Sequence, residues 1–264
     1  MEVELPGHRW TLKKVVNLVE KRTGIQISRS KARTMLQRAG LSWKKCKKLL
    51  TKADPDKRAA YAAQLEGLFT AMCQGKVRLI YIDEVHLHQD MDLGYSWSTR
   101  GEADWVPSHS PGLSAKLNWY GAYDFTDGQC FLWENGRCNS DNTIGFLQAL
   151  SQWLEQSESA LPVCIIMDGA PWHRSHRVYS AADDLGIELV RLPAYSPDLN
   201  PIEGLWKWMR EDITQRHCHS SLAALANACH KFIDRINSDP NRLIQRLWPK
   251  FDLDPDYEKR LVSN

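Results

Sequence analysis

Residues 77–84, VRLIYIDE, begin the part of the chain that decides the fold. A short, almost wholly apolar run that ends in acidic residues is typical of a strand buried in a sheet. Similar runs follow at 115–125 (AKLNWYGAYDF) and 128–135 (GQCFLWEN), with turn residues between them, and Gly94–Thr99 is a further candidate strand. This region is therefore predicted to begin with a meander of strands.

Helices and strands then alternate. The apolar patterns predict a helix over 142–156, a strand over 162–168 (PVCIIMD), a helix over 174–185, a strand over 187–192, and helices near 201–216, 220–237 and 239–247. Meandering strands followed by this alternation predict an α/β domain over residues 76–250, with a mixed sheet and helices on both faces. The order is that of a ribonuclease-H-like fold. Residues 251–264 are predicted to be a C-terminal tail.

The N-terminal part differs in charge. Residues 1–52 contain 14 Lys or Arg against three Glu, whereas the rest contains 20 against 29. Apolar periodicity predicts two short helices within 11–24 and 27–40, and a basic stretch at 41–52 would suit a wing. We therefore predict a small all-α winged helix-turn-helix at 1–52 that binds DNA, followed by a linker and connecting helix at 53–75. Its candidate DNA-contacting residues are Arg29, Lys31, Arg33, Arg38, Lys44 and Lys45. The alternative is a helical pair whose basic residues are merely solvated.

Three acidic residues are candidates for chemistry. Asp83 and Asp168 each close an apolar strand pattern, and chemistry in open α/β sheets is typical of the crevice beyond the strand ends. Glu203 lies in the proline-rich stretch LPAYSPDLNPIEGLW at 192–206. Each has a structural alternative: an Asp at a strand end often forms a turn, and Glu203 occupies the capping-box position if Asn200 is the N-cap.

Taken together, the three carboxylates indicate a metal site. Clustered carboxylates raise one another's pKa unless a cation lies among them, and oxygen ligands select Mg²⁺ or Mn²⁺. Two such ions can clamp the attacking and leaving oxygens of a phosphoryl displacement. In this hypothesis Asp83 bridges two ions, and Asp168 and Glu203 each hold one.

Three motifs, YIDE, MDGAPWHRS and SPDLNPIEGLW, resemble the bacterial insertion-sequence branch of the mariner-type transposases, with 34 residues between Asp168 and Glu203. The resemblance covers nearly the whole chain. It implies a DDE transposase in which Asp83, Asp168 and Glu203 are the catalytic, metal-binding triad. It further implies cutting at terminal inverted repeats of double-stranded DNA, joining to TA-containing target DNA, and action as a homodimer.

The chain departs from that family in two ways. Family members commonly carry two helix-turn-helix units, whereas this chain begins at the second, which suggests a truncated or split copy. Gly169 follows Asp168 where many relatives have Asn. Two other functions stay open: a nuclease of the same fold that does not join strands, and a transposase-derived DNA-binding regulator without catalysis.

Several histidines invite a role. His173, five residues after Asp168, is a possible accessory residue that contacts phosphate or orients water, or else a packed or solvated histidine. The pairs His86/His88 and His217/His219 suggest zinc, but they lack well-spaced partners.

No nucleotide-binding glycine motif, membrane span or signal peptide is expected. Seven irregularly spaced cysteines indicate reduced thiols. We therefore expect a cytoplasmic protein, nucleoid-associated when bound to DNA.

Overall fold

The computed structural model describes residues 9–44, 49–109, 112, 114–157 and 159–262. It divides into two compact units, Met1–Lys48 and Leu49–Asn264. In the described part of the chain, no helix has the length and apolar character needed to cross a bilayer.

The first unit is a helix-turn-helix built from α1 (Leu12–Thr23) and α2 (Arg29–Arg38). Each helix has a side-chain N-cap: Thr11 accepts a hydrogen bond from the Lys14 amide, and Ser28 accepts one from the Lys31 amide. Gly24 ends α1 with a positive φ of 69°, a conformation that costs glycine little. The expected wing is not seen in its described residues, since residues 41–44 form no strand and 45–48, including Lys45, lie outside the described chain.

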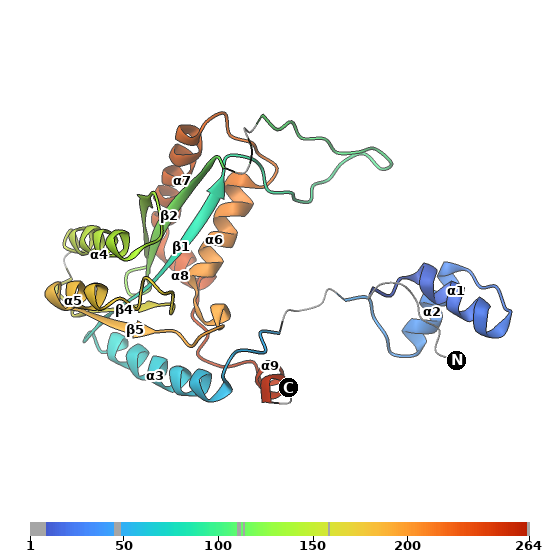
Figure 1. Ribbon diagram of the computed structural model, residues 1–264, viewed down its shortest axis with the longest axis horizontal. Coiled ribbons are helices and arrows are strands. Elements are labelled where there is room, and N and C mark those ends of the chain that lie inside the picture. Colours follow the sequence, from blue (N-terminus) through green and yellow to red (C-terminus); the bar gives the residue numbers. More distant parts are fainter. Residues whose placement is uncertain (1–8, 45–48, 110–111, 113, 158, 263–264) are drawn as a thin grey trace. The chain divides into compact units, whose positions relative to one another are not determined.

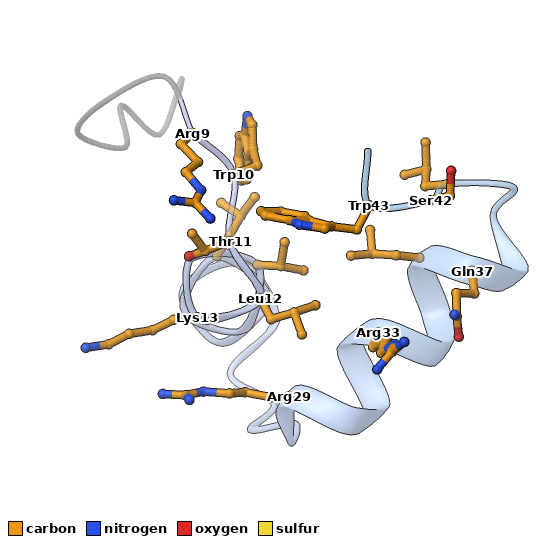
Figure 2. Close-up of a pocket in the computed structure, with 14 residues that line it drawn as sticks. Arg9, Trp10, Thr11, Leu12, Lys13, Arg29, Arg33, Gln37, Ser42 and Trp43 are labelled. Atoms are coloured by element: carbon orange, nitrogen blue, oxygen red, sulfur yellow. The ribbon is translucent and has the colours of Figure 1, made fainter. Parts of the chain in front are cut away.

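The two helices leave an apolar hollow between them. Figure 2 shows Trp10 and Leu12 on one side of it, Trp43 opposite, and Arg29 and Arg33 along α2. Neither helix is deeply buried, because α1 contributes no buried residue and α2 only Ala32. The predicted apolar stripes do face one another, but they are only partly covered.

The second unit is built on one mixed sheet of order β3-β2-β1-β4-β5. Strands β1 and β2 pair antiparallel, as do β2 and β3, whereas β1 and β4, and β4 and β5, pair parallel. The three-strand meander and the two later parallel strands agree with the prediction. The strands are β1 (Arg78–His88), β2 (Lys116–Asp124), β3 (Gln129–Asn135), β4 (Val163–Met167) and β5 (Ile187–Arg191).

Helices cover both faces of this sheet, which confirms the predicted α/β architecture. Buried side chains of α4 and α5 pack with Ile80 and Ile82 on one face, and α3, α6, α7 and α8 pack with Leu79, Tyr81 and Val85 on the other (Figure 1). The helices are α3 (Pro55–Cys73), α4 (Ser140–Leu154), α5 (His176–Asp184), α6 (Ile202–Met209), α7 (Leu222–Asn237), α8 (Pro240–Arg246) and α9 (Pro255–Val262), with a 3-10 turn at Pro197–Leu199 and a π-helical segment at Arg210–Thr214.

Two regions differ from expectation. The strand predicted at Gly94–Thr99 is wrong: this segment belongs to the long β1–β2 connection that projects from the sheet (Figure 1). Aromatic residues are typical of strands, but here Tyr95 and Trp97 are fully exposed rather than packed. The stretch predicted as a tail contains α9, whose Leu261 is buried.

Candidate active site

Strand register brings Asp83 and Asp168 together. Tyr81 of β1 pairs with Ile166 of β4, so two residues further along the parallel strands Asp83 comes opposite Asp168, at a strand spacing of about 4.8 Å. Strand β4 ends at Met167, but β1 continues to His88. Asp83 therefore lies within a strand rather than at its end, at the level where its neighbour stops.

Both aspartates belong to the face of the sheet that α6 covers. Side chains alternate along a strand, and Tyr81 and Ile166 lie in the core cluster on that face together with Leu205 and Trp206 of α6. Asp83 and Asp168 come two residues after Tyr81 and Ile166 and therefore lie on the same face. Glu203 lies in the first turn of α6, the helix that covers it.

Asp83 is held by α6. Its Oδ2 accepts a hydrogen bond of 3.0 Å from Trp206 Nε1, and Trp206 is only 2% exposed. The indole fits because β2 has a glycine below it: a Cβ on Gly121 would lie 2.1 Å from Trp206 Cη2. Burial, followed by the charge of Glu203, raises the pKa of Asp83 to about 7, although the Trp206 hydrogen bond opposes the shift.

Asp168 is held by a buried histidine. His173 is fully buried; its Nδ1 lies 2.7 Å from Asp168 Oδ1 and its Nε2 lies 3.0 Å from Glu84 Oε1. Trp172 Nε1 donates to the same Glu84 oxygen at 2.8 Å. Burial alone would lower the pKa of His173, but the hydrogen bonds to the two carboxylates outweigh it and raise the pKa to about 9. His173 is therefore an imidazolium that bridges two carboxylates.

The same contacts determine the charge of Asp168. Burial would raise its pKa, but hydrogen bonds from His173 and the Ala170 amide hold the pKa below the ordinary value. The half-exposed position of the Asp168 side chain also favours the ionised form. Of the roles considered for His173, the structure supports that of a packed residue that orients a candidate metal ligand.

Glu203 is not a capping-box residue. Asn200 has an extended backbone and its Oδ1 accepts a hydrogen bond of 3.4 Å from the Ile202 amide, as an N-cap does, and Pro201 after it is already helical. The Asn200 amide, which a capping box would offer to Glu203, instead donates to Pro197 O at 3.0 Å. The Asn200 side-chain amide also contacts Ile82 O at 3.4 Å. The reciprocal half of the capping box is therefore absent, and the Glu203 carboxylate is left available to a ligand.

The three carboxylates act on one another electrostatically. Burial raises the pKa of Glu203, the charge of Arg210 lowers it, and the charge of Asp168 raises it again. Glu203 therefore interacts with Asp83 on one side and with Asp168 on the other. In the described residues, no three Asp, Glu, His or Cys side chains stand close enough to bind one ion jointly. The electrostatic contacts therefore link two neighbouring pairs of carboxylates, with Glu203 common to both.

The described candidate DNA-contacting residues are exposed but do not form one face, and Lys45 lies outside the described residues. Arg29 and Arg33 line the apolar hollow, whereas Lys31 and Arg38 lie on the other side of α2, because each residue turns the helix by about 100°. Lys44 is exposed beyond α2. The basic residues therefore flank the apolar stripe on both sides.

One histidine of each H-x-H pair has a hydrogen-bond partner in the protein, whereas the buried His88 Nδ1 has none among the described residues. His219 Nε2 donates to Ile213 O at 3.0 Å, and His86 Nδ1 lies 2.7 Å from Asn118 Oδ1. In the described chain, neither the His86/His88 pair nor the His217/His219 pair belongs to a group of three side chains that could hold a metal ion. Sequence reasoning missed Glu84 and Trp172 as parts of the site. Both stand beside predicted residues, in YIDE and APWH, but only the fold shows that they meet.

Both units match known families. Residues 78–226 match the family model described as DDE superfamily endonuclease, and residues 6–65 match that of a winged helix-turn helix. The insertion element IS630 uncharacterized 39 kDa protein of Shigella sonnei is 26% identical over 233 residues, covering 88% of this chain. This chain spans 66% of the length of that protein.

Solved structures share the fold. The Mos1 mariner paired end complex with Mn superposes with a TM-score of 0.66 at 16% identity, covering 100% of this chain and 81% of that chain. The Mos1 strand transfer complex gives a TM-score of 0.64 at 16% identity, over 100% of this chain and 80% of that chain. At such identities the likeness establishes the architecture.

Proposed function

The chain belongs to the DDE superfamily endonucleases, and we propose that it is a metal-dependent DNA transposase whose catalytic carboxylates are Asp83, Asp168 and Glu203. The observation that supports this most directly is that strand register and α6 bring these three residues to one face of the sheet, where their charges act on one another. A buried carboxylate with a pKa near 7 is unfavourable for structure alone. A cation-binding site would account for such a buried carboxylate.

The donor set fits Mg²⁺ or Mn²⁺. All three candidate ligands offer hard oxygens, and His173 has both ring nitrogens engaged, so this histidine does not compete as a ligand. In our proposal two ions are held, with Asp83 shared and Asp168 and Glu203 holding one each. Bound divalent ions would supply Lewis-acid activation of the attacking and leaving oxygens of a phosphodiester.

The protein's own residues prepare that chemistry. Trp206 directs one oxygen of Asp83 toward α6 and leaves the other for a ligand. His173, anchored on Glu84, keeps Asp168 ionised and fixes its Oδ1. Glu203 stands in the first turn of α6, where the helix N-terminus favours its anion. None of these groups need attack phosphorus, since a water or a DNA 3′-hydroxyl is the nucleophile of such reactions.

DNA binding is assigned to the first unit. Its exposed basic residues, including Arg33, Arg38 and Lys44, are suited to phosphate contacts. The proposed substrates are duplex terminal inverted repeats and a target containing TA, with a homodimer as the working form. The Mos1 complexes with DNA ends share this fold, which supports the proposal. We further propose that the protein acts in the cytoplasm, associated with the nucleoid.

The proposal is tested by replacing Glu203 with Gln, which keeps the shape of the side chain but removes the charge of the ligand. Cleavage of a donor plasmid at its element ends should fall by at least about 100-fold, because the loss of a metal ligand or of a group that stabilises the transition state commonly costs this much. Glu211→Gln is the matched control in the π-helical segment that follows α6, where the carboxylate pairs with Arg246. Wild-type cleavage rates in the Glu203 variant would refute the assignment.

A second assay separates a transposase from a nuclease of the same fold. Element ends that have already been cut are supplied with a target plasmid and Mg²⁺ or Mn²⁺. Joined product is expected, and nicked target alone would identify a nuclease. If the wild-type protein neither cleaves nor takes up Mn²⁺ in calorimetry, the chain is instead a DNA-binding regulator.

A further inference from the structure

A buried arginine of α3 binds the turn that leads into Glu203. Arg58, on the first turns of α3, has no exposed surface. Its Nη1 and Nη2 donate to the two carboxylate oxygens of Asp198, each at 3.0 Å. Asp198 lies in the 3-10 turn Pro197–Leu199, five residues before Glu203. This forked pairing fixes direction as well as distance, which a lysine could not do.

The same guanidinium is held on its other side by the C-terminal helix. Arg58 Nε donates to Glu258 Oε1 at 2.8 Å, and Nη2 lies 2.7 Å from that oxygen. The guanidinium carbon also lies 5.0 Å from the centre of the Tyr257 ring. Tyr257 in turn accepts a hydrogen bond from the Leu50 amide at 3.2 Å. Helix α9 therefore completes the set of contacts around Arg58.

The path from Asp198 to Glu203 is stiff. Leu199, Asn200 and Ile202 are all buried, and the Asn200 amide group contacts Ile82 O, next to Asp83. Before the turn, Tyr195 has a φ of 57°, a conformation that is unfavourable for a side chain of this size and persists where the surroundings impose it. A displacement of Asp198 would therefore be passed to the first turn of α6.

We infer that Arg58 is a positioning residue for Glu203, and that Glu258 of α9 holds Arg58 in the orientation that this requires. The inference rests on the proposed function, because it assigns a purpose to the placement of a proposed metal ligand. It gives α3 and α9, which contribute no ligand themselves, a role in setting where the Glu203 carboxylate lies relative to Asp83 and Asp168.

The test uses Arg58→Lys and Glu258→Gln in the full chain. Arg78→Lys is the matched control, since Arg78 is also a buried arginine paired with two carboxylates, Asp124 and Asp127, but stands at the far end of β1 from Asp83. Two quantities are measured for each variant: amide hydrogen exchange of peptides covering residues 195–204, and Mn²⁺ affinity by calorimetry without DNA. Melting temperature serves as the measure of general destabilisation.

Arg58→Lys is expected to weaken Mn²⁺ binding by about tenfold, as for other residues that orient metal ligands, and to accelerate exchange over 195–204. Arg78→Lys should lower the melting temperature and leave both quantities as in the wild type. Glu258→Gln should accelerate the same exchange to a smaller degree. The inference is overturned if Arg58→Lys changes only the melting temperature, or if its exchange pattern equals that of Arg78→Lys. Unchanged exchange in Glu258→Gln would overturn the part assigned to α9.

Failure of the proposed function would look different. A wild-type protein that takes up no Mn²⁺ refutes the metal site, whereas the exchange measurement does not depend on metal and still shows whether Arg58 holds the turn.

Discussion

At the scale of single residues, the site is defined by what each carboxylate touches. Burial and Glu203 raise the pKa of Asp83 to about 7, whereas hydrogen bonds from His173 and Ala170 keep the pKa of Asp168 below its usual value despite burial. Identical functional groups thus differ in charge because of their neighbours. Trp206 opposes protonation of Asp83 by donating a hydrogen bond to its carboxylate.

Replacing Trp206 with Phe tests that contact. The variant keeps a large ring on Gly121 but loses the N–H donor, so we expect the cleavage rate to fall about fivefold, equivalent to the roughly 1 kcal/mol of one hydrogen bond. Trp208→Phe is the control, since Trp208 is a buried tryptophan of the same helix that packs on Phe232 and Arg246. Equal rates for the two variants, measured as initial cleavage of a donor plasmid, would show that the hydrogen bond has no role.

At the scale of elements, the site depends on the close approach of α6 to β2. Gly121 makes that approach possible, because any side chain there would occupy the space of the Trp206 ring. We expect Gly121→Ala to destabilise the fold by about 1–3 kcal/mol through overpacking and to reduce cleavage, since the displaced indole moves away from Asp83. Urea unfolding measures the first effect.

Gly67→Ala is a comparison variant that is expected to raise the stability of the fold rather than lower it. Gly67 lies in α3, and a Cβ added there would meet nothing within 4 Å, so alanine should stabilise the fold by about 0.5–1 kcal/mol. A Gly121 variant as stable as the wild type would mean that Trp206 can move without cost, and the close packing would not be needed.

The π-helical segment Arg210–Thr214 is tied to the following loop by His219. This histidine is 6% exposed. Burial lowers its pKa, the hydrogen bond to Ile213 O raises it, and the nearby His217 lowers it, so that the pKa lies below the ordinary value. Because the folded chain disfavours protonated His219, the unfolded chain binds more protons as the pH falls below about 6.5. The contribution of His219 to stability is therefore complete above that pH and declines below it.

We expect the contribution of His219 to the free energy of unfolding to fall between pH 7.5 and 5.5, with a slope of at most about 1.4 kcal/mol per pH unit, whereas Asp83 and His173, whose pKa values are raised, contribute with the opposite sign. His219→Gln, which keeps an N–H for Ile213 O, should reduce this dependence, and replacement of the exposed His176 by Gln should not. The measurement is urea unfolding at a series of pH values. The same slope in both variants would exclude His219 as the titrating group.

At the scale of the whole molecule, charge is divided between a basic N-terminal part and an acidic remainder, at net +11 and −9 on either side of residue 52. Counterion release from DNA follows the number of phosphates neutralised. We expect duplex binding to weaken with salt, and the log–log slope to decrease by about 0.9 for each phosphate contact removed among Arg33, Arg38, Lys44 and Lys45. Fluorescence anisotropy at several salt concentrations measures the slope, and an unchanged slope after all four are neutralised would refute this surface.

Much of this organisation is determined by sequence alone. Apolar periodicity and caps such as Thr11 and Ser28 are local, so helices α1, α2, α4 and α7 and the five strands could be predicted from their own residues. The three acidic residues could likewise be proposed from local patterns, namely the apolar runs before Asp83 and Asp168 and the proline-flanked turn before Glu203, although β1 continues past Asp83 to His88. Local patterns failed at Gly94–Thr99, where alternating aromatic residues face solvent in a connection.

Only the tertiary structure decided what holds the carboxylates. Glu84 meets His173 across 89 residues, Arg58 meets Asp198 across 140, and Trp206 meets Asp83 across 123. Such partners are chosen by strand register and by how closely helices pack on the sheet, and neither is encoded in the spacing around any one of these residues. Sequence determined which groups can do the chemistry, and the packing of distant segments decided their orientation and charge.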